Sequence, residues 1–446
     1  EMLEGFSNKG MITVALLFLV SEGIRQSGTL GQVIKKLLPQ GKTTVFKAQL
    51  RILPSVAFIS AFLNNTPVVV IFAPIIKHWA KSVNLPATKF LIPLSYVTIL
   101  GGICTLIGTS TNLVVHGMIL EAGFEGFSMF ELGKVGIFIA IAGIIYIFLF
   151  SKRLLPDARP DTAVPDEEVE EGEKLHRVEA VLGARFPGIN KKLKDFNFQR
   201  HYGAEVKEIK TRNGQRFVTN LDDVVLHEGD TLVVMADDTF IPTWGESSVF
   251  VLLTNGNEPD TSGKKKRWFA LLLLVLMIVG ATVGELPITK EMFPDIKLDM
   301  FFFVSITTII MAWTNLFPAR KYTKYISWDI LITIACAFAI SKAMVNSGVA
   351  DSVAKFIIGL SDDYGPHVLL AMVFIITNLF TELITNNAAA ALAFPLALSI
   401  SAQLGVSPTP FFVVICMAAS ASFSTPIGYQ TNLIVQGIGN YKFTDF

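Results

Sequence analysis

Eight apolar runs constrain the fold of this chain more than any other feature. A membrane-spanning helix needs about 20 predominantly apolar residues, and runs approaching that length indicate spans rather than surface helices. The runs lie at 10–24, 86–105, 129–150, 268–284, 298–317, 326–346, 366–381 and 409–424. Because only 17% of the 446 residues are charged, the chain has too little polar surface for a soluble protein of its size. The sequence predicts an all-α polytopic membrane protein.

Two polar clusters interrupt this apolar sequence, one near each end of the chain. The first is Asn64-Asn65-Thr66-Pro67, followed by a glycine-containing stretch at 101–113. The second is Thr385-Asn386-Asn387, followed by a similar stretch at 426–433. Amides, hydroxyls and glycines are unusual at membrane depth, where polar groups must line a cavity or find partners. The clusters are therefore the candidate functional residues.

Self-alignment indicates that the two ends of the chain are copies of one another. An offset of 320 residues matches Ile107-Gly108 with Ile427-Gly428 and Thr111-Asn112-Leu113 with Thr431-Asn432-Leu433. With a one-residue slip, Asn65 meets Asn386. Polar and glycine matches held in this way over about 110 residues are more than shared apolar composition produces. We interpret the chain as a tandem duplication.

Loop charge predicts that the two copies cross the membrane in opposite directions. The loop after the first apolar run is basic, whereas the equivalent loop of the second copy is mainly acidic. The residues are Lys35, Lys36, Lys42, Lys47 and Arg51 in the first loop, and Asp351, Lys355, Asp362 and Asp363 in the second. Cytoplasmic loops are enriched in Lys and Arg, so the first loop is placed inside and the second outside. Inverted repeats are the common plan of secondary transporters, with the binding site at the repeat interface near the bilayer midplane.

The predicted organisation has two membrane repeats separated by a soluble insertion. Repeat 1 covers 1–156, with a re-entrant hairpin at 51–76 and a broken helix at 86–122. An acidic linker at 157–175 and a soluble domain at 176–245 follow it. Repeat 2 covers 264–446, with a hairpin at 366–400 and a broken helix at 409–438. Comparing the two copies leads us to expect about two further helices before the first residue and one after the last.

The insertion has a different composition from the membrane part. Residues 157–175 carry eight acids and two bases, which is typical of a solvated linker. Short strands are predicted at 178–182, 204–210, 223–225 and 231–235, with a short helix at 190–196. The stretches 198–204 and 227–233 resemble the C-terminal domain of regulators of potassium conductance. Basic helix ends flank the insertion, so residues 157–263 are predicted to be cytoplasmic.

Helix breaks inside the membrane give the polar clusters their predicted chemistry. A broken helix presents a partial positive charge at the N-terminus of one half and free carbonyls at the C-terminus of the other. Intramembrane Asn and Thr also serve as interhelical hydrogen-bonding residues, but two equivalent pairs, each followed by a glycine break, favour a binding site. Glu382, three residues before Thr385, is either a proton carrier or a structural residue.

Both hairpin tips and both glycine breaks resemble the divalent anion/sodium symporter family of the ion transporter superfamily. The family's Ser-Asn-Thr tip is matched by Asn64-Asn65-Thr66 and Thr385-Asn386-Asn387, with the central Asn kept in both. Where the dicarboxylate branch has Thr-Pro-Pro-Asn, this chain has 109–112 and 429–432, Thr-Ser-Thr-Asn and Tyr-Gln-Thr-Asn. Together with the inserted domain, this difference resembles the sulfate-transporting branch.

The resemblance implies an elevator-type, sodium-coupled symporter of a small dianion, usually a homodimer, in the plasma or inner membrane. It implies two sodium sites, one at Asn64, Asn65 and Gly108 and the other at Thr385, Asn386 and Gly428. It places the anion between them, at Asn65, Thr66, Thr109, Asn386, Asn387, Tyr429 and Gln430. It also suggests a nucleotide or second messenger as a ligand of the soluble domain.

Other functions remain open from the sequence. Within transport, the alternatives are a cation/proton antiporter with Glu382 as proton carrier, or a carrier of arsenite, another oxyanion or a dicarboxylate. Outside transport, the alternative is a membrane receptor that senses an anion and signals through its cytoplasmic domain. No nucleophile–base pair or metal-ligand spacing appears in the sequence, so we expect no enzymatic activity. Balanced charge, with 37 bases and 37 acids, predicts no nucleic-acid partner.

Overall fold

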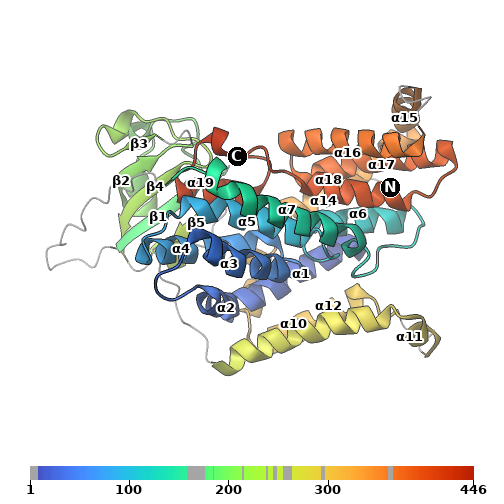
Figure 1. Ribbon diagram of the computed structural model, residues 1–446, viewed down its shortest axis with the longest axis horizontal. Helices are drawn as coiled ribbons and strands as arrows, with labels where there is room; N and C mark the ends of the chain where they lie inside the picture. Colours follow the sequence, from blue (N-terminus) through green and yellow to red (C-terminus); the bar gives the residue numbers. More distant parts are fainter. Residues whose placement is uncertain are drawn as a thin grey trace.

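A computed structural model describes residues 9–157, 176–183, 185–212, 215–237, 240–244, 249–254, 264–292, 297–359 and 365–446. Most of these residues are helical, and one small sheet lies at one end of the molecule (Figure 1). Among the described helices, four are long and apolar enough to cross a bilayer: Gly133–Leu154, Lys265–Gly284, Pro366–Leu383 and Asn386–Leu404. Joining the bent pair Ile330–Asn346 and Val349–Gly359 brings the number to 5.

The helices before the sheet are α1 (Lys9–Gln26), α2 (Thr29–Leu37), α3 (Val45–Ser60), α4 (Asn65–Ser82), α5 (Thr88–Gly102), α6 (Ser110–Glu121) and α7 (Gly133–Leu154). Those after it are α10 (Lys264–Gly284), α11 (Pro287–Met292), α12 (Met300–Trp313), α13 (Tyr322–Tyr325), α14 (Trp328–Asn346), α15 (Val349–Gly359), α16 (Pro366–Leu383), α17 (Asn386–Leu404), α18 (Thr409–Ser420) and α19 (Gln430–Gly439). Each of the eight apolar runs coincides with one of these helices, namely α1, α5, α7, α10, α12, α14, α16 and α18.

The hairpin helices extend beyond the predicted limits of 51–76 and 366–400. The α3/α4 pair covers 45–82 and the α16/α17 pair covers 366–404. Pro54, Pro74 and Pro395 lie inside these helices instead of ending them. Membrane helices tolerate proline because neighbouring helices and hydroxyl side chains satisfy the freed backbone groups.

The two predicted helix breaks fall where the glycines are. Residues 103–109 separate α5 from α6, and residues 421–429 separate α18 from α19. At Gly101, a Cβ atom would lie 2.1 Å from the Ala57 carbonyl oxygen of α3, so only glycine allows α3 and α5 to approach this closely. At Gly108, a Cβ atom would lie 2.5 Å from the Gly102 carbonyl oxygen, and the break is compact for the same reason.

A five-stranded antiparallel sheet forms the module that is predicted to be soluble. Its strands are β1 (His176–Leu182), β2 (Glu205–Lys210), β3 (Arg216–Phe217), β4 (Thr231–Ala236) and β5 (Phe250–Thr254), in the order β3-β2-β4-β1-β5. The short helices α8 (Phe198–Tyr202) and α9 (Phe240–Trp244) accompany it. Residues Val178, Ala180 and Leu182 of β1 face a core rich in aromatic side chains, because alternate residues of a strand share one face.

The module differs from its sequence prediction in three places. The helix predicted at 190–196 is only a 3-10 turn, Leu193–Asp195, because Asn190 adopts a left-handed φ of 62°. The strand predicted at 223–225 is a single bridge between Lys192 and Val225. The sheet also continues past the predicted boundary at 245, because β5 pairs with β1 and covers its edge.

Candidate functional site

Four helix N-termini lie together where the two polar clusters meet. Helices α4 and α17 begin at the hairpin tips, and α6 and α19 begin after the two breaks. Side-chain contacts join them in pairs: Thr66 to Gln430 between α4 and α19, and Thr111 to Asn387 between α6 and α17. Each N-terminus carries unpaired N–H groups and a partial positive charge. The arrangement can stabilise an anion without any basic side chain.

The Asn65 amide lies at the centre of the first cluster and is fully buried. One end of the amide lies 2.8 Å from Ser60 Oγ, 3.0 Å from the Thr98 carbonyl oxygen and 3.2 Å from the Gly108 carbonyl oxygen. The amide nitrogen donates to these oxygens when it points toward them. When the amide is turned over, its own oxygen joins them. Four converging oxygens are a suitable donor set for sodium.

Asn386 occupies the matching position in the second cluster. Thr381 Oγ1 lies 2.8 Å from Asn386 Oδ1 and 2.6 Å from the Ala419 carbonyl oxygen. In the first cluster, Ser60 Oγ lies 2.8 Å from Asn65 Oδ1 and 2.8 Å from the Thr98 carbonyl oxygen. The same hydroxyl–amide–carbonyl arrangement therefore occurs at both tips.

Tyr429 connects the two clusters. Its hydroxyl lies 2.6 Å from the other end of the Asn65 amide, which donates to it as Nδ2 or accepts from it as Oδ1 according to the amide orientation, and it lies 3.3 Å from Thr109 Oγ1. It also interacts with the side chain of Asn386. A single hydroxyl thus contacts the central Asn of both tips, which places these residues within one small volume.

Two buried asparagines hold the helix breaks in shape. Asn112 Nδ2 donates to the carbonyl oxygens of Gly102 and Thr105, at 3.3 and 2.9 Å. Asn432 Nδ2 donates to the carbonyl oxygens of Ser422 and Thr425, at 2.9 and 3.1 Å. Each amide replaces backbone hydrogen bonds that the broken helix has lost, at the same spacing along the chain.

Several polar atoms near the breaks have no hydrogen-bond partner. Within the described part of the chain, these include Asn112 Oδ1, Ser420 Oγ and Ser422 Oγ, all of which are buried. Buried polar atoms are normally paired, so an unpaired group indicates a site for a water or an ion. This observation fits a cation held near each break.

The predicted site residues take different positions. Side-chain contacts link Asn65, Thr109 and Asn386 through Tyr429, and the Gly108 carbonyl lies beside the Asn65 amide. Separate contacts join Thr66 to Gln430 and Asn387 to Thr111. Thr385 is exposed and accepts a hydrogen bond from the Ala388 N–H as the N-cap of α17. The Gly428 N–H donates to Thr425 Oγ1 at 3.1 Å, so this glycine belongs to the second break.

Sequence reasoning missed the hydroxyls of Ser60 and Thr381. Both lie five residues before the central Asn of their tip, and the alignment that matches Asn65 with Asn386 also matches Ser60 with Thr381. The signal was therefore present in the repeat. It was overlooked because this serine and this threonine lie in mainly apolar helical sequence, outside the two polar clusters.

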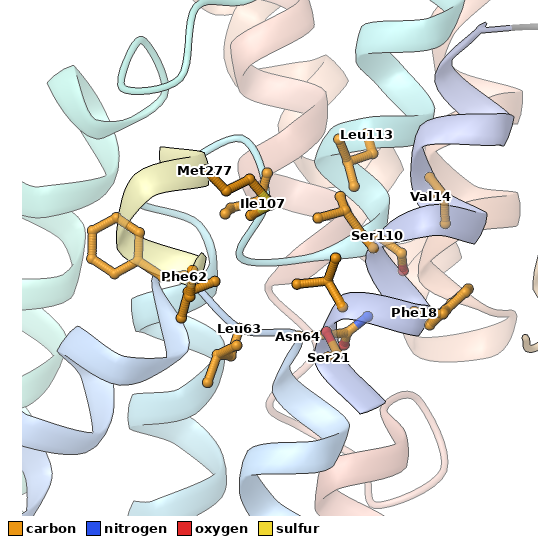
Figure 2. A pocket seen from close by; sticks show the side chains of 13 residues that line it. Val14, Phe18, Ser21, Phe62, Leu63, Asn64, Ile107, Ser110, Leu113 and Met277 are labelled. Atoms are coloured by element: carbon orange, nitrogen blue, oxygen red, sulfur yellow. The ribbon is translucent and has the colours of Figure 1, made fainter. Parts of the chain in front are cut away.

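Asn64 lines a small cavity (Figure 2). This small cavity is lined by Ser21 and Phe18 of α1, by Ser110 of α6 and by Met277 of α10. A larger cavity of about 650 Å³ shares Leu113 with it and is lined by Lys9, His116, Glu125, Glu285 and Asp299, among others. Leu113 thus lies at the boundary of both cavities.

Comparison with known proteins identifies the class of this chain. A family model described as a citrate transporter matches residues 1–398 and again 296–446. The chain belongs to the citrate transporter family. The match confirms the resemblance to the ion transporter superfamily, and with several apolar helices of membrane length it indicates an integral membrane protein.

Three relatives show the range of this likeness. An uncharacterized transporter from Synechocystis is 29% identical over 100% of this chain and 86% of its own length. Sodium/sulfate cotransporter 2 from Chlamydomonas reinhardtii is 31% identical over 61% of this chain and 30% of its own length. A sodium-dependent dicarboxylate transporter from Staphylococcus saprophyticus is 30% identical over 27% of this chain and 23% of its own length.

Proposed function

We propose that this protein is a sodium-coupled symporter of a small divalent oxyanion, with sulfate as the main substrate. The observation that carries the proposal is the meeting of four helix N-termini at a cluster of uncharged amides and hydroxyls. Relatives named as sodium/sulfate cotransporters support the substrate and the coupling ion.

The absence of basic residues from both clusters gives a physical reason for coupling. The stretches 64–67, 101–113, 385–388 and 426–433 contain no Lys or Arg. Helix dipoles alone offset only part of a dianion's charge, so the anion is held well only while cations occupy the oxygen cages. A fixed arginine would hold the anion without them and would uncouple the two fluxes.

The first sodium ion is assigned to Asn65, Ser60 and the carbonyls of Thr98 and Gly108. The second is assigned to Asn386, Thr381 and the break beside Gly428, where Ser420 and Ser422 have unpaired hydroxyls. Asn64 and Thr385 stay proposed contributors through their backbone carbonyls. The anion is placed between the cages, beside Thr66, Thr109, Asn387, Tyr429 and Gln430.

The matched hydrogen bonds of the two tips support an arrangement of inverted repeats that move together as an elevator. In this proposal the two copies thread the membrane in opposite directions, the soluble module is cytoplasmic, and two chains form a homodimer in the plasma membrane. A nucleotide or second messenger is the proposed ligand of the module. This ligand is tested by titrating the whole protein with nucleotides and measuring its melting temperature at each concentration. An unchanged melting temperature would count against the ligand.

Uptake of labelled sulfate into proteoliposomes tests the function directly. Uptake driven by an inward sodium gradient, and absent with a proton gradient alone, is the expected result. Uptake driven by protons would support the antiporter-like alternative, and sodium-driven uptake of a dicarboxylate in preference to sulfate would change the substrate. Binding of sulfate with no flux under any gradient would support a receptor.

Glu382 provides a sharper test of the proton-coupled alternative. Its carboxylate accepts hydrogen bonds from the Ser424 N–H at 3.0 Å and from Thr425 Oγ1 at 2.8 Å. These contacts tie the carboxylate to the second helix break, which is a structural role. Its aligned counterpart, Ala61, offers only its backbone carbonyl, which accepts a hydrogen bond from Thr105 Oγ1.

We therefore expect Glu382→Gln to keep sodium-driven uptake, with a loss of no more than about tenfold, because the amide oxygen still accepts one of the two hydrogen bonds. The measurement is the initial rate of sulfate uptake under sodium and proton gradients. Complete loss of sodium-driven uptake in Glu382→Gln would contradict the structural role.

A further inference from the structure

The face of the soluble sheet that is turned away from its own core contacts the membrane helices. In Figure 1 the sheet lies beside α19 and α4. Val181 of β1 and Leu252 of β5 belong to the hydrophobic cluster of the membrane helices, whereas Val178 and Leu182 of β1 belong to the module's own core. The sheet is therefore buried on both faces, and one of them is an interface.

Close packing joins this face to α19. A Cβ atom on Gly437 would lie 2.7 Å from Thr231 Oγ1 and 3.1 Å from Val181 Cγ2, so the glycine allows the strands to approach the helix. One residue earlier, Gln436 Nε2 donates to the Arg212 carbonyl oxygen at 3.0 Å. This contact comes from the half of α19 that is remote from Tyr429.

A partly buried ion pair joins the same face to α4. Lys77 Nζ lies 3.0 Å from both carboxylate oxygens of Glu179, and Lys210 Nζ of β2 lies 3.3 Å from one of them. Burial by itself raises the pKa of Glu179, but the two lysine charges outweigh it and lower the pKa to about 2. The carboxylate is therefore charged at physiological pH, and removing Lys77 would leave it incompletely paired.

The two helices that the module contacts, α4 and α19, also begin in the candidate site. Helix α4 begins at Asn65 and α19 begins beside Tyr429, and these two residues are joined by a hydrogen bond. Each helix thus has one end in the candidate site and the other on the module. Because helices are stiff, a change in the spacing of the gripped ends alters the spacing of the tips.

We propose that the module is a brace that stays docked on α4 and α19 throughout transport and keeps the two tips in their binding geometry. A ligand that loosens or tightens the brace would then change the affinity of the site, because coupling between two sites is reciprocal. The effect on uptake rests on the proposed transport function, whereas the docking itself does not.

Docking can be measured by the accessibility of a single thiol in the full-length protein. Cys104, Cys336 and Cys416 are replaced by alanine, and one new cysteine is introduced by Val181→Cys, at the interface, or by Val178→Cys, in the module core. Both valines are buried, at 0% and 1% exposure. A polar maleimide labels the first site when the module undocks and the second only when the module unfolds.

Lys77→Glu places a second carboxylate beside Glu179 and should undock the module. We expect labelling at residue 181 to become at least about tenfold faster, while residue 178 stays protected, because only the interface opens. Lys81→Glu makes the same charge change one turn further along α4, at an exposed position, and should change neither rate. Unchanged protection of residue 181, or equal exposure of both residues, would overturn the docking.

Transport measurements then test the bracing role. With Lys77→Glu, the half-saturating sodium concentration for sulfate uptake should rise by about fivefold, a typical size for coupling between sites. Uptake that is unaffected in an undocked variant would overturn the brace. If the wild-type protein shows no uptake, the proposed function is rejected instead. The labelling rates would still report on docking.

Discussion

Replacing Asn65 by alanine is expected to abolish sodium-driven uptake. The side chain is fully buried, reaches three oxygens of the first cage and is hydrogen-bonded to the Tyr429 hydroxyl. Losing a hydrogen-bonding group to a charged ligand costs about 3 kcal/mol, which corresponds to a roughly hundredfold loss of affinity. The measurement is the initial rate of labelled sulfate uptake into proteoliposomes as a function of sodium concentration.

Two further variants define what this loss means. Asn386→Ala should reduce sodium-driven uptake by a similar factor, because the contacts of Asn386 repeat those of Asn65. Uptake by the double variant should be no lower than uptake by either single variant. Asn346→Ala, at the exposed end of α14, is the matched control and should transport normally. Sodium-driven uptake that survives in both single variants would contradict the assignment of the cages.

Replacing Gly101 by alanine is expected to destabilise the protein. The new Cβ atom would lie 2.1 Å from the Ala57 carbonyl oxygen and 2.8 Å from Ala57 Cα. These are backbone atoms, so relief requires α3 to move away from α5. Overpacking of this kind costs about 1–3 kcal/mol, and the movement also shifts Ser60 and Thr98, which are joined across the same helices.

The measurement is the apparent melting temperature of the purified protein, with and without sodium, alongside its uptake rate. Gly101→Ala should lower the melting temperature and reduce any stabilisation by sodium. Gly359→Ala is the control, because nothing lies within 4 Å of a Cβ atom there and its φ is not in the left-handed region. An unchanged melting temperature for Gly101→Ala would show that the contact between α3 and α5 is looser than described.

Much of the membrane part could be predicted because two independent signals agree there. Apolar length located the helices, and the repeat marked Asn65 and Asn386 as equivalent before any geometry was known. The breaks at Gly108 and Gly428 could be predicted from glycines within apolar sequence. A broken helix leaves backbone groups without partners, and at membrane depth these groups need polar side chains to pair with. Asn112 and Asn432 are the partners that provide it.

Contacts between residues far apart in sequence could not be predicted. Nothing in the sequence places the Tyr429 hydroxyl on Asn65, which is 364 residues away. Nothing in the sequence pairs Lys77 with Glu179 of the module either, although the two side chains are in contact. The limits of the module were also uncertain, because β5 is a short apolar stretch whose identity as a strand depends on pairing with β1.

The difference between Thr109 and Tyr429 has a consequence for the origin of the molecule. These residues are equivalent at the offset of 320, yet only the tyrosine contacts the central asparagine of the opposite half. A chain made from two copies of either half would lack this link or contain two bulky rings competing for one space. Under the predicted duplication, the two halves are therefore no longer interchangeable, and later divergence of each half is tied to the other.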